Sequence, residues 1–438
     1  MDAVCVIGAG GAGLAAAQAL KARDVPFVVH EAGSGIGGNW RYENDSGRSS
    51  AYASLTTNVS RQRTSYRCFP LRRGPLYLHH TQMLAYLEAF TDRFGLRQHI
   101  RLSSPVTSVR PLDDGGWEVD AEGGAPERYR AVLLATGYNS EPRYPNLPGR
   151  FDGLALHTHD YRTPEPFARR DTIVIGLGCS AAELACEVRH VSRSTTIAAR
   201  SGNWVMPRRL GPMPLDWLDI QAGSRLPFSL RRRMIKPLAR LWGGDLGKAG
   251  LPRPSGRLLD KPWAISDELM GAWRTGEISV TGPVTELAGD SVRLADGRRL
   301  PADAILYGTG YRAEFPFLAP EVQPPTLELS RLYRGVVHPD APGLFFIGLV
   351  MAHGALIPIF EAQANWVAEV LADRLALPST EVMRASIACD DEVRRRDFDP
   401  RWGILWDRLP YIRSLETETG RARRLPGTSQ RAAAPTVR

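Results

Sequence analysis

The stretch VCVIGAGGAGLAAAQAL, residues 4–20, decides the fold class of this chain. It has the pattern of an apolar strand, a glycine turn and a helix, and Gly8, Gly10 and Gly13 have the spacing G-x-G-x-x-G. In a dinucleotide-binding unit the first glycine permits the tight turn, the second lets the backbone approach a pyrophosphate, and the third lets the helix pack closely on the strand. The N–H groups at the helix N-terminus then bind phosphate oxygens. The stretch therefore predicts a Rossmann-like unit at the start of the chain.

An acidic residue ends the next predicted strand. The stretch PFVVHE ends at Glu31, which lies 23 residues after Gly8. This spacing is close to the roughly 20 residues expected for the acid that binds a ribose hydroxyl. Because a carboxylate accepts hydrogen bonds from a free 2′-hydroxyl, the first unit is predicted to bind an unphosphorylated adenosine ribose.

The same pattern occurs a second time, with a basic residue at the corresponding position. VIGLGCSAAELACE, residues 174–187, again has a strand, a glycine turn and a helix, and the next strand ends at Arg200, 24 residues after Gly176. A guanidinium can pair with a 2′-phosphate, which favours NADP, although Arg200 could also be a solvated strand end. The residues predicted to bind this second nucleotide are Gly176, Gly178, Ser180, Ala181 and Arg200. Two units of opposite ribose preference indicate two cofactors that are used together, with FAD bound permanently and NADPH bound transiently.

Length and composition limit the other possibilities. A chain of 438 residues predicts two or three domains. The net charge is +8, but the arginines are scattered and form no dense basic run beside aromatic residues, which argues against a nucleic-acid partner. The five cysteines form no C-x-x-C pair, so we expect neither a metal site nor a redox dithiol, and a reducing, cytoplasmic location fits.

Two apolar stretches bear on a membrane. Residues 343–360 are the most apolar, but glycines, His353 and Pro358 interrupt them, so we expect no spanning helix; the N-terminus also lacks the basic region of a signal peptide. In residues 228–242, Leu230, Met234, Leu238 and Leu241 recur about one helical turn apart among basic residues. Core packing with a solvated basic face is the expected interpretation of this helix, and contact with a membrane surface is the alternative.

The segment between the two glycine units carries a family pattern. Phe151, Gly153, His157, Tyr161 and Arg162 fill every position of FxGxxxHxxxY(K/R). With both glycine motifs, the GGxW at residues 37–40, and the stretch FEAQANW at residues 360–366, the chain resembles the class B flavoprotein monooxygenases of the flavin-containing monooxygenase group. The resemblance implies an α/β fold with two doubly wound Rossmann-like domains, the NADP domain inserted in the FAD domain. The expected boundaries are 1–147 and 304–438 for the FAD domain, and 148–303 for the NADP domain with a helical insertion at about 211–254.

The resemblance also implies roles for single residues. Asn58 is the first choice as a catalytic contributor, near the oxygenated flavin, and an ordinary turn asparagine is the alternative. His157 and Tyr161 are expected to be structural. The resemblance adds the following residues to the glycines and Glu31 as expected cofactor contacts: Gly38, Trp40, Asn58, Val106, Thr136, Thr309 and Gln363.

The reaction implied by the resemblance is NADPH- and O2-dependent oxygenation of a small molecule through a flavin C4a-hydroperoxide. A nitrogen or sulfur nucleophile is the main expectation, and it needs no acid or base from the protein. Baeyer–Villiger oxidation is one alternative, weakened because Tyr161 and Arg162 stand where such enzymes have Trp-Pro. The length of the insertion and its GLPRP (residues 250–254) resemble auxin-forming members, so oxidative decarboxylation of a 2-oxo acid is another. A peroxide-forming flavoprotein is the third alternative. The sequence leaves the oligomeric state open, a homodimer included.

Overall fold

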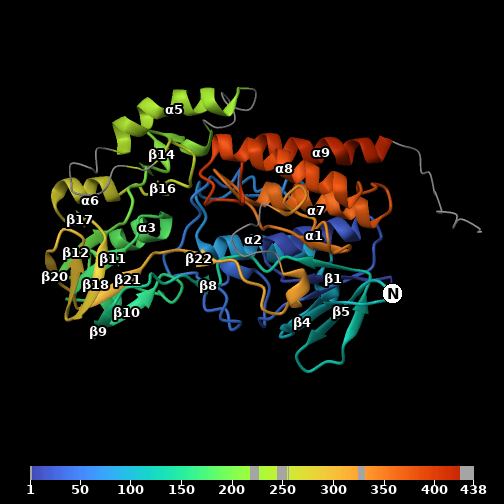
Figure 1. The fold of residues 1–438 in the computed structure, drawn as a ribbon, viewed down its shortest axis with the longest axis horizontal. Coiled ribbons are helices and arrows are strands. Elements are labelled where there is room, and N and C mark those ends of the chain that lie inside the picture. The colour runs from blue at the N-terminus through green and yellow to red at the C-terminus, as the bar shows by residue number, and fades with distance from the viewer. Residues whose placement is uncertain (1, 218–225, 244–253, 255, 324–330, 425–438) are drawn as a thin grey trace, which may run out of the picture.

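The computed structural model describes residues 2–217, 226–243, 254, 256–323 and 331–424. Two α/β domains lie side by side in Figure 1, and each is built on a five-stranded parallel sheet. The predicted fold class, two doubly wound domains with one inserted in the other, is confirmed. We call the domain that holds both ends of the described chain the first domain, and the inserted one the second domain.

The sheet of the first domain has the order β23-β7-β1-β2-β3. The strands are β1 (Val4–Ile7), β2 (Phe27–His30), β3 (Ile100–Arg101), β7 (Ala131–Leu134) and β23 (Leu344–Phe346). Alternate side chains of β1 enter two different cores. Val4 and Val6 face a helical layer, whereas Cys5 and Ile7 face a small antiparallel sheet. This alternation is the period of two expected for a strand buried on both faces.

The two covering layers of the first domain are of different kinds. The helical layer consists of α1 (Gly11–Lys21), α2 (His80–Arg93), α7 (Ile357–Leu371), α8 (Thr380–Asp397) and α9 (Arg408–Arg424), with α1 packed directly on α7. The other layer is the antiparallel sheet β4 (Val106–Pro111), β5 (Trp117–Ala121) and β6 (Glu127–Tyr129). A buried ion pair, 2.9 Å long, joins Arg23, just after α1, to Glu369 on α7.

The second domain repeats this arrangement. Its parallel sheet has the order β10-β21-β11-β12-β17. The strands are β10 (Leu154–His157), β11 (Asp171–Ile175), β12 (Ser194–Ala198), β17 (Ser279–Thr281) and β21 (Ala304–Tyr307). One face packs on α3 (Cys179–Val188) and α6 (Leu269–Thr275). The other packs on the sheet of β9 (Gly149–Phe151), β18 (Val284–Gly289), β19 (Ser291–Leu294) and β20 (Arg299–Pro301).

One predicted domain boundary is wrong. The sequence placed the return to the first domain at residue 304, but β21 pairs in parallel with both β10 and β11, so residues 304–307 belong to the second domain. The chain returns after Tyr307, through Thr309 and Gly310. There β22 (Tyr311–Arg312) pairs with β8 (Glu141–Pro142), which lies on the outgoing crossing. The two connections between the domains therefore pair with each other as a short antiparallel ribbon.

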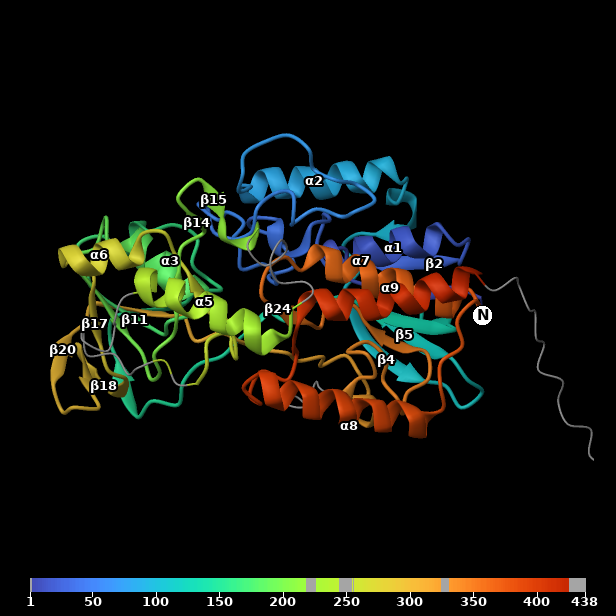
Figure 2. The ribbon, with the colours of Figure 1, turned by 90° about the horizontal axis from the view of Figure 1, so that it is seen from above.

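The insertion contains a helix that spans both domains, α5 (Phe228–Gly243). In Figures 1 and 2, α5 lies along the outside of the molecule and extends from the second domain toward α8 and α9. Its Phe228 ring meets the Phe398 ring at 4.9 Å, and Arg231 forms an ion pair with Asp407. Residues 218–225 and 244–253 of the insertion lie outside the described part of the chain.

The expectation that the apolar stripe of this helix packs into the core is wrong. Leu230, Met234 and Leu241 are 42%, 50% and 73% exposed, while the side chain of Leu238 lies outside the described residues. The residues that pack inward lie on another face and include Phe228, Ile235 and Ala239. Both sets recur at helical spacing, so the sequence period alone could not choose between them. Within the described part of the chain, no helix is long and apolar enough to cross a membrane.

The remaining elements are short. The strand pairs are β13 (Val205–Met206) with β16 (Ala264–Ile265), β14 (Arg209–Leu210) with β15 (Met213–Pro214), and β24 (Met351–Ala352) with β25 (Leu405–Trp406). The 3-10 turns are η1 (Gly38–Trp40), η2 (Arg97–His99), η3 (Glu165–Phe167) and η5 (Pro320–Val322).

Candidate active site

The glycines of the first turn have the geometry that their spacing predicts. Gly8 has φ of +102°, a conformation that favours glycine, at the end of β1. A Cβ on Gly13 would lie 1.8 Å from the carbonyl oxygen of Gly8, so only glycine lets α1 approach β1 this closely. A Cβ on Gly10 would lie 3.5 Å from the Cα of Gly38, the first residue of η1. Gly10 and Gly38 therefore pack closely, backbone against backbone, at the N-terminus of α1, whose free N–H groups are the expected phosphate site.

Glu31 lies directly beside this turn. It follows β2 and is buried, and its two carboxylate oxygens accept hydrogen bonds from Ala9 N at 2.6 Å and from Gly33 N at 2.9 Å. These bonds fix the carboxylate at the carboxyl edge of the sheet, where nucleotides bind in this class of fold. A carboxylate has four lone-pair positions, so two such bonds leave capacity for ribose hydroxyls.

The other residues predicted to contact the flavin surround the same edge. Trp40 ends η1 and packs partly on the helical core, and Thr136 follows β7. Val106 begins β4, close to Glu31, because the nearby Ser104 N donates to the Glu31 carbonyl at 2.8 Å. Their contact with the cofactor stays a prediction.

Gln363 is fully buried and bonded within the protein. Its Oε1 accepts from Gly348 N at 2.9 Å, and its Nε2 donates to Tyr411 Oη at 2.8 Å. The side chain therefore holds the segment after β23 on α7 and α9. A Cβ on Gly348 would lie 2.9 Å from the Ala12 Cβ, so this segment lies tightly against α1. Cofactor contact by Gln363 stays a prediction, and these bonds assign it a positioning role for this segment.

The second glycine turn is equally tight at its first position and open at its second. Gly176 has φ of +124°, and a Cβ there would lie 2.3 Å from the carbonyl oxygen of Gly308. At Gly178 no described atom lies within 4 Å of such a Cβ, so the backbone faces open space at the N-terminus of α3. Ala181 can replace the third glycine because it packs against another glycine, Gly308. Ser180, in the first turn of α3, is half-buried beside this opening.

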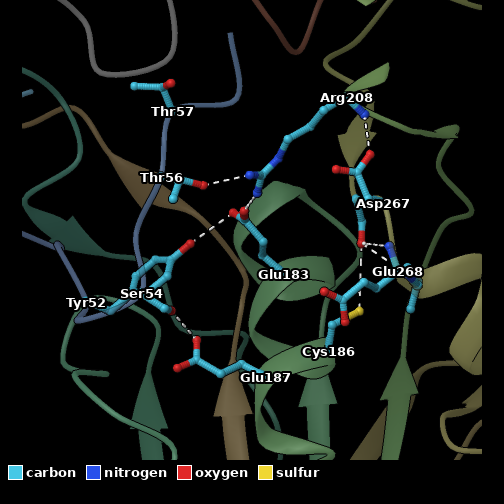
Figure 3. Close-up of polar contacts among 12 residues, drawn as sticks. Tyr52, Ser54, Thr56, Thr57, Glu183, Cys186, Glu187, Arg208, Asp267 and Glu268 are labelled. Carbon is cyan, nitrogen blue, oxygen red and sulfur yellow. Dashed lines mark hydrogen bonds and ion pairs between the residues drawn. The ribbon is translucent and has the colours of Figure 1, made fainter. Parts of the chain in front are cut away.

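The two arginines near this turn differ in what they contact. Arg200 follows β12, is exposed, and makes no hydrogen bond or ion pair with any residue in the described ranges. Arg208, in contrast, is bonded to other residues of the protein. Its guanidinium forms an ion pair with Glu183 and donates to Thr56 Oγ1 at 2.6 Å (Figure 3). Arg200 is therefore the better candidate of the two for a 2′-phosphate.

The residues of the family pattern lie in and around the connection between the domains. His157 is fully buried and accepts from His159 N at 3.0 Å, and burial lowers its pKa to about 4. Tyr161 is also fully buried, while Arg162 donates to the carbonyls of His159 and Ser49. On the return connection, Thr309 Oγ1 donates to the carbonyl of Arg143. The Arg162 bond to Ser49 ties this connection to the first domain, and the structural role expected for His157 and Tyr161 stays a prediction.

Asn58 lies at a cavity between the domains. Its Oδ1 is buried and has no hydrogen-bond partner among the described residues. The cavity, of about 70 Å³, is lined by the first domain, the second domain and the insertion. Its apolar lining residues are Val59, Pro207, Leu215, Phe228, Ile235, Leu259, Trp263, Ile265, Ala355 and Trp406. A buried amide oxygen without a partner is costly in an apolar cavity, so it marks a place where a ligand donates a hydrogen bond.

Several cavity residues were not predicted from the sequence. Trp263 and His353 come from different domains, and their rings lie 5.4 Å apart, with His353 Nε2 2.9 Å from the Leu259 carbonyl oxygen. Arg63, Asp216 and Arg408 also line the cavity. None of them belongs to a motif, and no spacing in the sequence connects them, so no local signal could have identified them.

Comparison with known proteins agrees with this geometry. A model of the family described as Flavin-binding monooxygenase-like matches residues 1–417. The chain belongs to this family. Flavin-containing monooxygenase 5 from Oryctolagus cuniculus is 32% identical over 409 residues, which cover 88% of this chain and 76% of the relative. Flavin-containing monooxygenase 3 from Rattus norvegicus is 30% identical over 442 residues, covering 95% and 82%. The protein is thus a flavin-dependent monooxygenase, an oxidoreductase.

Solved structures of flavin monooxygenases have the same fold. S-allyl-L-cysteine S-oxygenase from Allium sativum superposes with a TM-score of 0.71 at 25% identity, covering 95% of this chain and 88% of that one. An open form of cyclohexanone monooxygenase gives 0.71 at 20% identity, covering 97% and 99%. The flavin-containing monooxygenase from Stenotrophomonas maltophilia gives 0.66 at 22%, covering 85% and 99%. The last two likenesses concern the fold alone, so they leave the type of oxygenation open.

Proposed function

We propose that this flavin monooxygenase uses FAD, NADPH and O2 to oxygenate a nitrogen or sulfur nucleophile of a small molecule. The observation that carries the proposal is Asn58, whose buried amide oxygen has no partner among the described residues and lies at a largely apolar cavity lined by both domains. A single buried, unsatisfied amide in such a cavity is the feature expected of a site that positions a polar ligand atom.

The residues present fit both cofactors. The glycine turn at the N-terminus of α1, together with the Glu31 carboxylate, would hold the adenosine half and pyrophosphate of FAD. The open backbone at Gly178 and the exposed Arg200 would hold the pyrophosphate and 2′-phosphate of NADPH. The chemistry that bound FAD would supply is to accept hydride from NADPH and to activate O2.

The chain's own contribution is positioning and exclusion of water. Trp263, Phe228 and Leu259 give the cavity apolar walls, and these keep water from the reacting atoms. The Asn58 amide offers both an acceptor and donors in this environment, where hydrogen bonds to a polar group are stronger than in water. Because an amine or thioether attacks with its own lone pair, the site needs no acid or base to activate it.

Two observations support nitrogen or sulfur over a carbonyl substrate. The chain has Tyr161 and Arg162 where the resemblance places Trp-Pro in Baeyer–Villiger enzymes. The Allium relative, which matches over most of both chains, is an S-oxygenase by name. The likeness to cyclohexanone monooxygenase is a likeness of fold.

The test is a comparison of NADPH oxidation, O2 uptake and product mass with amines, thioethers, ketones and 2-oxo acids. We expect a product heavier by one oxygen atom from an amine or a thioether, in proportion to the NADPH consumed. Product from ketones or 2-oxo acids alone would replace the proposed substrate class. Quantitative hydrogen peroxide with every compound would replace the monooxygenase reaction by the peroxide-forming one.

A further inference from the structure

The segment that carries Asn58 belongs to the first domain but is packed into the second. Tyr52 is buried among the side chains of the second domain's helical core, and its ring lies 6.0 Å from that of Tyr161. Leu55 packs on the same core. Residues 52–60 therefore lie where the two domains meet, and their conformation depends on both.

Helix α3 holds the start of this segment through two carboxylates (Figure 3). Tyr52 Oη donates to Glu183 at 2.9 Å, and Ser54 Oγ donates to Glu187 at 2.6 Å. Glu183 and Glu187 are four residues apart, so they lie on one face of the helix. The same helix begins at the open glycine turn predicted to hold the NADP pyrophosphate.

Three further hydrogen bonds to the second domain lie on either side of Asn58, and we call them the bracket. Two residues before it, Thr56 Oγ1 accepts from Arg208 at 2.6 Å. Two residues after it, Ser60 donates to Asp216 through its backbone N at 3.1 Å and its Oγ at 2.6 Å. Each bond is charge-assisted, which makes it stronger than a hydrogen bond between neutral groups.

The Arg208 end of the bracket is anchored in the second domain. Arg208 is held by its ion pair with Glu183 on α3, and its backbone N donates to Asp267 at 2.7 Å. The first domain holds the middle of the segment, because Thr57 N donates to the Leu78 carbonyl at 2.8 Å. Asn58 is thus the residue at which contacts from the two domains meet.

We propose that Arg208 and Asp216 are positioning residues that fix the Asn58 amide only while the second domain is docked, so that NADP⁺ binding at α3 and the placement of Asn58 are coupled. The inference rests on the proposed function for its consequence in oxygenation. The coupling itself is a property of binding and segment order, and it is reciprocal: NADP⁺ orders the segment, and an intact bracket tightens NADP⁺.

The first test is amide hydrogen exchange of the peptide covering residues 54–61, measured on the flavin-loaded protein with and without NADP⁺. We expect NADP⁺ to slow exchange of this segment by about 10-fold or more in the wild type, the effect of one charged hydrogen bond. Thr56→Val together with Ser60→Ala removes both side-chain bonds but keeps the bond from Ser60 N to Asp216, so it should reduce that protection.

Matched control variants show whether the loss of protection comes from the bracket or from the loss of a threonine or serine hydroxyl as such. Thr285→Val alters an exposed threonine of β18 whose Oγ1 bonds the Arg293 carbonyl. Ser194→Ala removes another serine–aspartate bond, to Asp171, in the second domain. Both controls should keep the wild-type protection, and Thr56→Ser, which retains the hydroxyl, should keep it when combined with native Ser60.

The second measurement is the NADP⁺ dissociation constant by titration, together with the fraction of NADPH electrons released as hydrogen peroxide. In the double variant both should rise, the dissociation constant by about 10-fold. Unchanged NADP⁺ protection in the double variant, or none in the wild type, would overturn the inference. Because exchange is independent of oxygenation, a wild type that makes only peroxide would refute the proposed function while leaving a positive coupling result in place.

Discussion

Replacement of Arg200 by alanine tests whether the second cradle distinguishes NADPH from NADH. Arg200 is exposed after β12, and it bonds no residue in the part of the chain that the structure describes. Its removal therefore leaves no protein group unpaired, so any lost affinity reports the contact with the nucleotide. Arg208→Ala would not give this information, because it would break the ion pair with Glu183.

The expected loss of NADPH affinity follows from the exposure of the Arg200 side chain. A hydrogen bond to a charged group contributes about 1.5–3 kcal/mol, which corresponds to roughly 10- to 150-fold in affinity. Because solvent and salt screen an exposed pair, we expect the lower end, about 10-fold, for NADPH at physiological ionic strength. The effect on NADH should stay within about 2-fold, since NADH has no 2′-phosphate.

The assay is anaerobic stopped-flow reduction of the flavin over a range of NADPH and NADH concentrations, which yields a dissociation constant for each. Arg274→Ala, which removes an exposed arginine from α6 of the same domain, is the control for net charge. The loss should appear only with Arg200→Ala and only with NADPH, and it should shrink at high salt. Equal affinity of the wild type for both nucleotides, or an equal loss for both, would refute the role of Arg200.

Three further predictions follow from the site and the fold. In Asn58→Ala, NADPH oxidation should continue while product yield falls by up to about 10²-fold and hydrogen peroxide replaces product, since one positioned polar group is lost; an unchanged yield would remove Asn58 from the reaction. Gly178→Ala should keep the bound flavin and the thermal stability but weaken the binding of NADPH. Gly13→Ala should instead yield flavin-free or unfolded protein, because its Cβ would lie 1.8 Å from the Gly8 carbonyl oxygen. Flavin absorbance and thermal melting distinguish the two outcomes. Because burial lowers the pKa of His157 from 6.5 to about 4, the unfolded state binds more protons between these values, so the free energy of unfolding should fall as pH drops through that window. Urea unfolding should show a smaller fall in His157→Asn, and an identical pH dependence would contradict this.

The sequence by itself determined the two cradles and their order. A glycine turn, the helix that follows it and the residue that ends the next strand lie within about 25 residues of each other. The steric limit at Gly13 comes from the Gly8 carbonyl, five residues earlier, so the spacing of the motif already contains it. The opposite charges of Glu31 and Arg200 could be recognised for the same reason.

The tertiary structure decided the rest. It corrected the return crossing from residue 304 to beyond Tyr307, because strand partners, and not the strand's own residues, assign β21 to a sheet. It selected the buried face of α5, where two sets of residues share the same helical period. It also assembled the cavity at Asn58 and the contacts around it, in which Ser60 meets Asp216 across 156 residues of chain. A contact of that kind arises from the docking of two domains, and the free energy that selects it comes from surfaces that are distant in the sequence.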